Sequence, residues 1–242
     1  MTTSMTTSMT TSSQGFSCFV TGTDTEIGKT LISCALLHAL AQKGQVAVGM
    51  KPVAAGAVLR DGVWHNDDVD LLRAHSSVQL PTEVVAPYVL RTAAAPHIAA
   101  QREHIHIDLD LILQQYQTIR QTTPNVVVEG VGGFVVPFSY SCDSAVLAQR
   151  LALPIILVVG MRLGCLNHAL LTVEAIAARG LHLAGWVANL VDEQMAFAFD
   201  NCTALAERID APLLGWVPRM ATPGAPTAAA CLDFSRLPNW PA

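Results

Sequence analysis

Short apolar runs alternate with longer helical stretches along most of the chain, and this alternation restricts the fold more than any other feature. Strands are expected at 16–21, 46–51, 125–129, 154–159, 183–189 and 213–217. Helices are expected at 29–42, 67–75, 109–120, 143–151, 167–179 and 195–209. Strands and helices in alternation build βαβ units, in which a parallel sheet is covered by helices on both faces. The chain is therefore predicted to have an α/β fold.

The composition narrows the class of protein. The chain has 242 residues, of which 51% are hydrophobic and 14% charged, and its formal net charge is -5. Such a chain is neither disordered nor collagen-like, and it lacks the basic surplus of a protein that coats nucleic acid. Every apolar run, such as 153–160, is interrupted well before the about 18 residues that span a bilayer. We expect a soluble protein without a nucleic-acid or membrane partner.

The domain organisation is expected to be simple. No Pro/Gly/Ser-rich linker divides the chain, so 15–242 is predicted to be a single domain, with 54–96 as its least regular part, made of loops and a short helix. Segment 1–14 repeats MTTS without a charge and is predicted to be a disordered, low-complexity leader rather than a targeting signal. The low charge fits either a sheet buried on both faces or a subunit interface, and composition leaves both open.

The cysteines indicate the redox environment. They are Cys18, Cys34, Cys142, Cys165, Cys202 and Cys231. They are scattered singly, without the dense spacing of a secreted disulfide scaffold. We therefore expect reduced thiols and a cytoplasmic location.

The strongest local signal is the segment GTDTEIGKT at 22–30, between the first predicted strand and the first predicted helix. In such a loop, backbone N–H groups and the positive end of the helix bind phosphate. Gly28 allows close approach, Lys29 reaches the terminal phosphates and Thr30 offers a hydroxyl to Mg²⁺. Five residues separate Gly22 from Gly28, one more than the generic pattern has. The alternative is a glycine-containing helix start followed by lysine by chance.

Three further groups stand where strands end or helices begin. Lys51 ends the second strand, where it either stabilises a transferring phosphoryl group or is an ordinary solvated lysine. Glu129 ends a buried strand, where it either binds Mg²⁺ or caps the glycine-rich turn that follows. In the cluster Asn66-Asp67-Asp68, a side chain either binds metal or caps the next helix, and the sequence leaves both open.

Other positions carry weaker signals. His104 and His106 alternate as residues on one side of a strand do, but without a third ligand they do not form a zinc site. The carboxyl ends of the strands, together with loops such as those of 54–96, are expected to form the binding crevice. Asn189 ends the run 183–189 at this crevice, where it either forms a turn or contacts a ligand.

Six segments occur in a set order and spacing. They are GTDTEIGKT, GMKPVAAG, HNDD, EGVGG, LVVGMRLGCLNHALLT and GWVAN. Together they resemble the dethiobiotin synthetases of biotin biosynthesis, over about 16–218. The five intervening residues of the phosphate loop belong to that family's pattern.

The resemblance implies a single P-loop NTPase-type domain that works as a homodimer with active sites at the interface. It implies a cyclo-ligase that uses ATP, Mg²⁺ and CO2 or bicarbonate to convert 7,8-diaminononanoate, a diamino fatty acid, into dethiobiotin. The intermediates would be a carbamate and a carbamic-phosphoric anhydride. Both are anionic, so the main stabilisation would come from lysines and a metal ion.

The resemblance also implies roles for individual residues. Lys51 and Lys29 would be catalytic, and Thr30, Asp68 and Glu129 would bind Mg²⁺. ATP would contact Glu26, Ile27, Gly28, Lys29, Thr30, Leu31, Asp68, Glu129, Gly130, Val131, Gly132, Asn189, Leu190, Pro218, Arg219 and Met220. The substrate would contact Thr25, Ala55, Cys165, Leu166 and Asn167, with the last three coming from the neighbouring subunit.

One position departs from the family's pattern. Ala55 stands where the family commonly has a serine, so a hydroxyl that contacts the substrate is missing. Losing one such hydrogen bond costs about 1.5–3 kcal/mol at most, so we expect weaker substrate binding or compensation by the backbone rather than loss of the reaction.

Two other functions compete with this one. An amidating ligase of the same superfamily would need a source of ammonia, and the chain has no glutamine-hydrolysing domain. A partitioning or positioning ATPase would carry an extra lysine at the start of the phosphate loop, where Thr21–Thr23 stand here.

Overall fold

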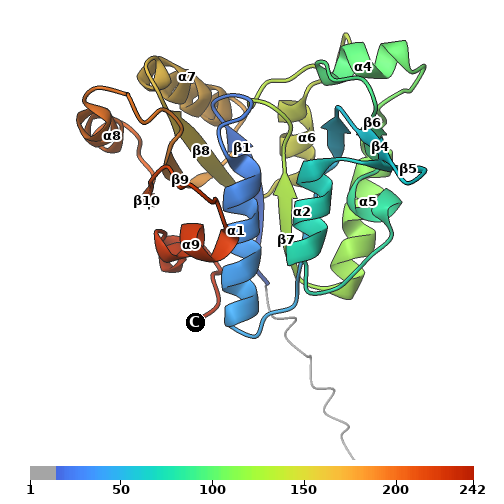
Figure 1. The fold of residues 1–242 in the computed structure, drawn as a ribbon, viewed down its shortest axis with the longest axis horizontal. Coiled ribbons are helices and arrows are strands. Elements are labelled where there is room, and N and C mark those ends of the chain that lie inside the picture. The colour runs from blue at the N-terminus through green and yellow to red at the C-terminus, as the bar shows by residue number, and fades with distance from the viewer. Residues whose placement is uncertain (1–14) are drawn as a thin grey trace, which may run out of the picture.

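A parallel sheet forms the centre of the protein in the computed structural model, which describes residues 15–242. The predicted leader at 1–14 lies outside the described residues. In the described part the sheet has six strands in the order β10-β9-β8-β1-β7-β2, and every neighbouring pair is parallel (Figure 1). The strands are β1 (Ser17–Gly22), β2 (Ala47–Met50), β7 (Asn125–Glu129), β8 (Ile155–Met161), β9 (Leu183–Leu190) and β10 (Leu213–Val217).

Helices cover both faces of this sheet. They are α1 (Lys29–Gln42), α2 (Asp67–His75), α3 (Thr82–Val85), α4 (Pro96–Arg102), α5 (Leu109–Thr122), α6 (Ser144–Leu151), α7 (Cys165–Ala178), α8 (Ala198–Ala206) and α9 (Ala225–Ala230). A 3₁₀ turn, Phe234–Arg236, follows α9.

The alternation of side chains along β1 shows how the two faces are filled. Cys18 and Val20 pack into the cluster that contains α1, α9 and Leu72 of α2, whereas Phe19 points to the other face, against α5 and α6. Along β8, Leu157 joins a third cluster under α7 and α8, on the same face as Phe19. Because successive side chains of a strand point to opposite faces, each apolar strand serves two layers of helices.

The predicted α/β architecture is confirmed, and each predicted strand and helix has a counterpart. The bounds of β7, β10, α1 and α2 agree with the expected ranges. Helix α8 is shorter than the expected 195–209, and α7 begins at Cys165, two residues before the expected start. Gly164, with a φ of 98°, ends the preceding turn and allows the earlier start.

The segment 54–96 is more regular than expected. It contains a parallel pair, β3 (Val53–Ala55) with β6 (Tyr88–Leu90), and an antiparallel hairpin, β4 (Val58–Arg60) with β5 (Val63–His65). Strands of three residues are too short to show an alternating pattern, so the hydrophobic pattern does not predict them. The strand suggested by His104 and His106 is wrong, because His104 has a left-handed φ of 55°.

None of the helices described in 15–242 is long and apolar enough to cross a membrane.

Candidate active site

The phosphate loop lies between the end of β1 and the start of α1. Glu26 and Gly28 both have left-handed backbone, with φ values of 58° and 90°. A Cβ on Gly28 would lie 2.3 Å from Nδ2 of Asn189, so this position requires glycine for conformation and for space. The Lys29 ammonium donates to the carbonyl oxygen of Asp24 at 2.7 Å, which bends the lysine back over its own loop.

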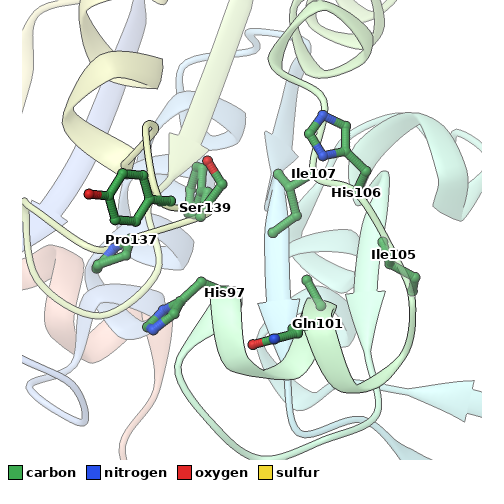
Figure 2. Close-up of a pocket in the computed structure, with 10 residues that line it drawn as sticks. His97, Gln101, Ile105, His106, Ile107, Pro137 and Ser139 are labelled. Atoms are coloured by element: carbon green, nitrogen blue, oxygen red, sulfur yellow. The ribbon is translucent and has the colours of Figure 1, made fainter.

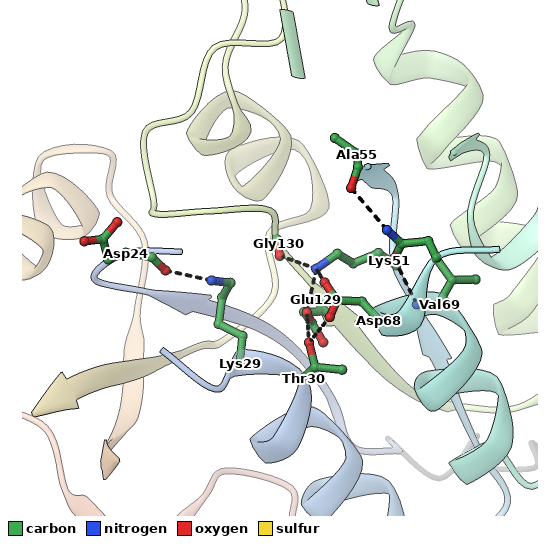
Figure 3. A network of polar contacts seen from close by, with 10 residues as sticks. Asp24, Lys29, Thr30, Lys51, Ala55, Asp68, Val69, Glu129 and Gly130 are labelled. Carbon is green, nitrogen blue, oxygen red and sulfur yellow. Dashed lines mark hydrogen bonds and ion pairs between the residues drawn. The ribbon is translucent and has the colours of Figure 1, made fainter. Parts of the chain in front are cut away.

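Four side chains converge beside this loop (Figure 3). Thr30 Oγ1 lies 2.7 Å from Asp68 Oδ1 and 2.8 Å from Glu129 Oε1. Lys51 Nζ lies 2.8 Å from Asp68 Oδ2 and 2.6 Å from Glu129 Oε1, and it also donates to the carbonyl oxygen of Gly130 at 3.2 Å. These four residues come from α1, the end of β2, α2 and the end of β7, and we call them the Lys51 cluster.

Charge and burial set the protonation states in this cluster. Burial alone would lower the pKa of Lys51, but the carboxylates of Glu129 and Asp68 outweigh it and raise this pKa. Burial alone would raise the pKa of Asp68, but the nearby Lys51 charge and the Lys51 and Thr30 hydrogen bonds lower it. Burial, together with the charge of Lys51, lowers the pKa of Lys29 to about 8. At neutral pH, Lys51 is therefore an ammonium facing two carboxylates.

The oxygen atoms of the cluster fit a Mg²⁺ ion. Glu129 is fully buried, and its Oε2 has no hydrogen-bond partner. The Thr30 hydroxyl has one proton for two carboxylate oxygens, so one oxygen contact is always without a hydrogen. Hard oxygen ligands are those that Mg²⁺ prefers, and it usually keeps waters and substrate phosphates as further ligands. Within 15–242, no group of three or more His, Cys, Asp or Glu side chains gathers as a metal site, so the chain itself offers two carboxylates and a hydroxyl.

The cluster opens into a cavity of about 950 Å³. Its lining residues are Asp24, Thr25, Glu26, Gly28, Lys29, Thr30, Lys51, Ala54, Ala55, Asp68, Ala93, Ala94, Ala95, Pro96, Val131, Gly132, Gly133 and Val136. The structure thus brings Glu26, Gly28, Lys29 and Thr30 of the expected phosphate loop to one place with Lys51, Asp68 and Ala55. The expected residues Ile27, Leu31, Glu129 and Gly130 do not line the cavity: Ile27 and Leu31 pack in the core, and Glu129 is buried behind Lys51. The run from Ala93 to Pro96 belongs to the segment 54–96, whose loops are expected at the crevice, but its residues are not among the predicted site residues. Its sequence carried one relevant signal, a proline suited to the first turn of a helix.

Asn189 and the other residues expected to contact adenine lie outside this cavity. Asn189 is buried, and its Nδ2 donates to the carbonyl oxygen of Ile27 at 2.7 Å, so it holds the phosphate loop from behind. Leu190 ends β9, and Pro218, Arg219 and Met220 follow β10. None of these residues lines the 950 Å³ cavity.

Cys165, Leu166 and Asn167 form the first turn of α7 and also lie outside this cavity. The Cys165 side chain is buried in the cluster under α7, and burial raises the pKa of its thiol. The turn before α7 reaches the phosphate loop through an ion pair between Arg162 and Asp24.

A second cavity, of about 600 Å³, lies between α4 and the segment 137–140 (Figure 2). His97, Gln101 and His106 supply polar groups, and the lining contains no charged side chain. It shares no lining residue with the cavity beside the phosphate loop.

Known proteins similar to this chain identify its family. The ATP-dependent dethiobiotin synthetase BioD of Janthinobacterium sp. (strain Marseille) is 60% identical over 230 residues, which cover 93% of this chain and 98% of that protein. The chain belongs to the ATP-dependent dethiobiotin synthetase family. The BioD of Aromatoleum aromaticum (strain DSM 19018 / LMG 30748 / EbN1) is 55% identical over 221 residues, covering 91% of this chain and 97% of that protein. The profile of a family described as an AAA domain matches residues 17–227.

The membership makes this chain a ligase of biotin biosynthesis and confirms the resemblance drawn from its motifs. Solved structures show the same fold at low identity. The septum site-determining protein MinD with Mg-ADP from Pyrococcus horikoshii OT3 matches with a TM-score of 0.53 and 15% identity, covering 92% of this chain and 88% of that one. The MinC:MinD complex of Aquifex aeolicus matches with a TM-score of 0.52 and 11% identity, covering 86% of this chain and 82% of that one. These matches support the P-loop NTPase fold, and the synthetase relatives argue against a positioning ATPase.

Proposed function

We propose that the Lys51 cluster and the adjoining cavity convert ATP, CO2 and 7,8-diaminononanoate into dethiobiotin, ADP and phosphate. One amine of the substrate adds to CO2 and loses a proton, which gives a carbamate. A carbamate oxygen attacks the γ-phosphorus of ATP and releases ADP, and the second amine then displaces phosphate and closes the ureido ring. The observation that carries the proposal is the convergence of Lys51, Thr30, Asp68 and Glu129 beside the phosphate loop.

The phosphate loop is proposed to bind the triphosphate. Residues 26–31 offer backbone N–H groups at the positive end of α1, and Val131 and Gly132 flank the same space, while the preceding Gly130 accepts from Lys51. Lys29 would exchange its contact with the Asp24 carbonyl for a phosphate oxygen. An ammonium beside a phosphate is stabilised in its protonated form, which offsets the depression of its pKa by burial.

Thr30, Asp68 and Glu129 are proposed to hold Mg²⁺. When bound, this ion would neutralise the developing charge on the phosphoryl oxygens. The unpartnered Glu129 Oε2 supports the assignment, because a fully buried carboxylate oxygen without a donor is costly unless a cation faces it.

Lys51 is proposed to stabilise the carbamate and the phosphoryl group during transfer. It is 3% exposed and protonated, so its charge acts in a region from which water is excluded. Reaching the substrate requires Lys51 to leave at least one of its two carboxylates. The proposed reaction needs cations at fixed positions, but it needs no nucleophile from the protein.

Thr25 and Ala55 are proposed to contact the diamine end of the substrate, since both line the cavity together with Lys51. The first turn of α7, with Cys165, Leu166 and Asn167, is proposed to bind the substrate carboxylate in the site of a second subunit, as a helix N-terminus can. This arrangement requires a homodimer.

Asn189 and Leu190 are proposed to contact adenine together with Pro218, Arg219 and Met220. Asn189 Nδ2 already donates to the Ile27 carbonyl oxygen, so Asn189 would contact adenine through Oδ1, as a hydrogen-bond acceptor. The cysteines of the described chain are all free thiols, which supports a cytoplasmic location.

The deciding assay supplies ATP, Mg²⁺, bicarbonate and the diamine, and measures phosphate together with the cyclic urea product. We expect one phosphate per urea and no turnover in EDTA. ATP hydrolysis that does not depend on the diamine, or no urea at all, would refute the proposal. Sedimentation of the protein at assay concentration tests the dimer.

A further inference from the structure

The wall of the cavity formed by the segment 91–95 is held from outside by one carboxylate. This segment connects β6 to α4, and Ala93, Ala94 and Ala95 line the cavity together with Lys51 and Ala55. Ala94 N–H donates to the Thr92 carbonyl at 3.0 Å, a local turn that does not by itself fix the segment in space. Short loops with few packed side chains need such an outside anchor to keep one conformation.

That anchor is Glu103, at the end of α4. Its Oε1 accepts a hydrogen bond from the Thr92 backbone N–H at 2.8 Å. Burial alone would raise the pKa of Glu103, but the N–H groups of Thr92 and Arg91 and the charge of Arg91 lower it, so the carboxylate is ionised. Helix α4 is itself fixed, because Ala99 and Ala100 are buried in the core.

Arg91 extends the connection to the β4–β5 hairpin. Its guanidinium carbon lies 4.8 Å from the centre of the Trp64 ring, which is a cation–π contact. The hairpin joins β3, which carries Ala55, to α2, which carries Asp68. The contacts of Glu103 and Arg91 therefore tie together α4, the cavity wall and the hairpin between Ala55 and Asp68.

We propose that Glu103 is a positioning residue for the diamine substrate, acting through the segment 91–95 and touching no substrate itself. The role rests on the proposed function of the cavity. The groups assigned to ATP and Mg²⁺ lie on the phosphate loop, at the start of α2, at the ends of β7 and β9 and after β10, and none of them is hydrogen-bonded to Glu103, whose link to the hairpin before Asp68 runs through Arg91. Loss of Glu103 therefore affects the binding of the diamine and leaves the binding of ATP intact.

The test compares Glu103→Ala and Glu103→Gln with a matched control, Glu207→Ala. Glu207 also follows the last residue of a helix, α8, and lies outside both cavities. For Glu103→Ala we expect the KM for the diamine to rise on the order of tenfold, the effect of one hydrogen bond to a charged acceptor, with the KM for ATP unchanged. Glu103→Gln keeps an acceptor oxygen without the charge and should give a smaller rise. The control should leave both constants unchanged.

Hydrogen exchange supplies a readout that does not depend on activity. Peptides that cover 91–95 should exchange faster in Glu103→Ala and not in the control, while peptides of the phosphate loop keep their protection. An equal rise in both KM values, an unchanged KM for the diamine, or unchanged exchange at 91–95 would overturn the role of Glu103. If the wild-type protein makes no urea, the proposed function fails, and the exchange measurement still decides whether Glu103 holds the segment.

Discussion

Lys51 Nζ lies 2.6 Å from Oε1 of Glu129, and the two side chains are 3% and 0% exposed. A buried pair of this kind gains little when it is compared with apolar residues, but removing one partner leaves a charge without compensation. Lys51 neutralises the two carboxylates that we assign to Mg²⁺. The same two ion pairs hold the Lys51 ammonium beside the phosphate loop.

Replacing Lys51 by methionine should therefore lower both the stability and the turnover, for two different reasons. In EDTA we expect the variant to lose about 3 kcal/mol of unfolding free energy, because Glu129 remains buried without a cation. Mg²⁺ should recover part of this loss, and its effect on Tm should be larger than in the wild type. Turnover should fall by at least about 10²-fold while ATP still binds. Denaturant unfolding measures the stability, and calorimetric titration measures ATP binding. Lys43→Met is the control, because Lys43 is an exposed lysine that follows α1.

The Asp68 carboxylate should make the stability of the metal-free protein depend on acid pH. Its pKa is lowered by Lys51 and Thr30, although burial alone would raise it, so the unfolded chain binds its proton more readily. The contribution is therefore present above the unfolded pKa of about 3.9 and is lost as pH falls through the lower folded value. In EDTA, Asp68→Asn should flatten this acid limb, whereas Asp67→Asn, on the surface, should not. An unchanged acid limb in Asp68→Asn would contradict the assignment.

Restoring the family's serine tests the departure at Ala55. This residue lines the cavity, and its carbonyl accepts from Asn66 Nδ2 at 3.2 Å, so its backbone is already held. Ala55→Ser should lower the KM for the diamine, up to about tenfold, or leave it unchanged. Steady-state kinetics checks this, and a clear rise in KM would mean that the cavity is built differently. Ala54→Ser is the contrast: Ala54 also borders the cavity, but it is 1% exposed and packs against Val69 and Ala86, so a hydroxyl there should reduce stability.

Gly28 and Gly44 form a matched pair for the phosphate loop. Both have left-handed backbone, so alanine should cost each variant about 1 kcal/mol of stability. A Cβ at Gly44 meets nothing within 4 Å, whereas at Gly28 it meets Asn189 Nδ2 at 2.3 Å. Gly28→Ala should therefore also weaken ATP binding by at least about tenfold, since losing the Asn189 contact frees the loop. Equal ATP affinities of the two variants, measured by calorimetry, would show that Asn189 does not hold the loop.

Long-range packing determines the surroundings of the residues for which the sequence left alternatives open. The alternative of a solvated Lys51 is wrong, because the side chain is buried between two carboxylates. In the acidic cluster, Asn66 caps α2 by accepting from Val69 N–H, while Asp68 faces Thr30 and Lys51, and its role as a Mg²⁺ ligand stays a prediction. No local pattern separates these roles, because each depends on which element packs opposite.

The sequence by itself determined the six strands of the central sheet, the six longer helices and the phosphate loop, because apolar periodicity and the GTDTEIGKT motif are properties of neighbouring residues. The tertiary structure alone decided which distant groups meet. Strand β7 lies between β1 and β2, and the carboxyl ends of parallel strands share one edge, so Glu129 comes to lie between Thr30 and Lys51. Likewise, the pairing of β3 with β6 places the segment 91–95 beside Ala55, where Glu103 holds it. Strands of three residues carry no pattern that specifies such a partner, and only the folded chain supplies it.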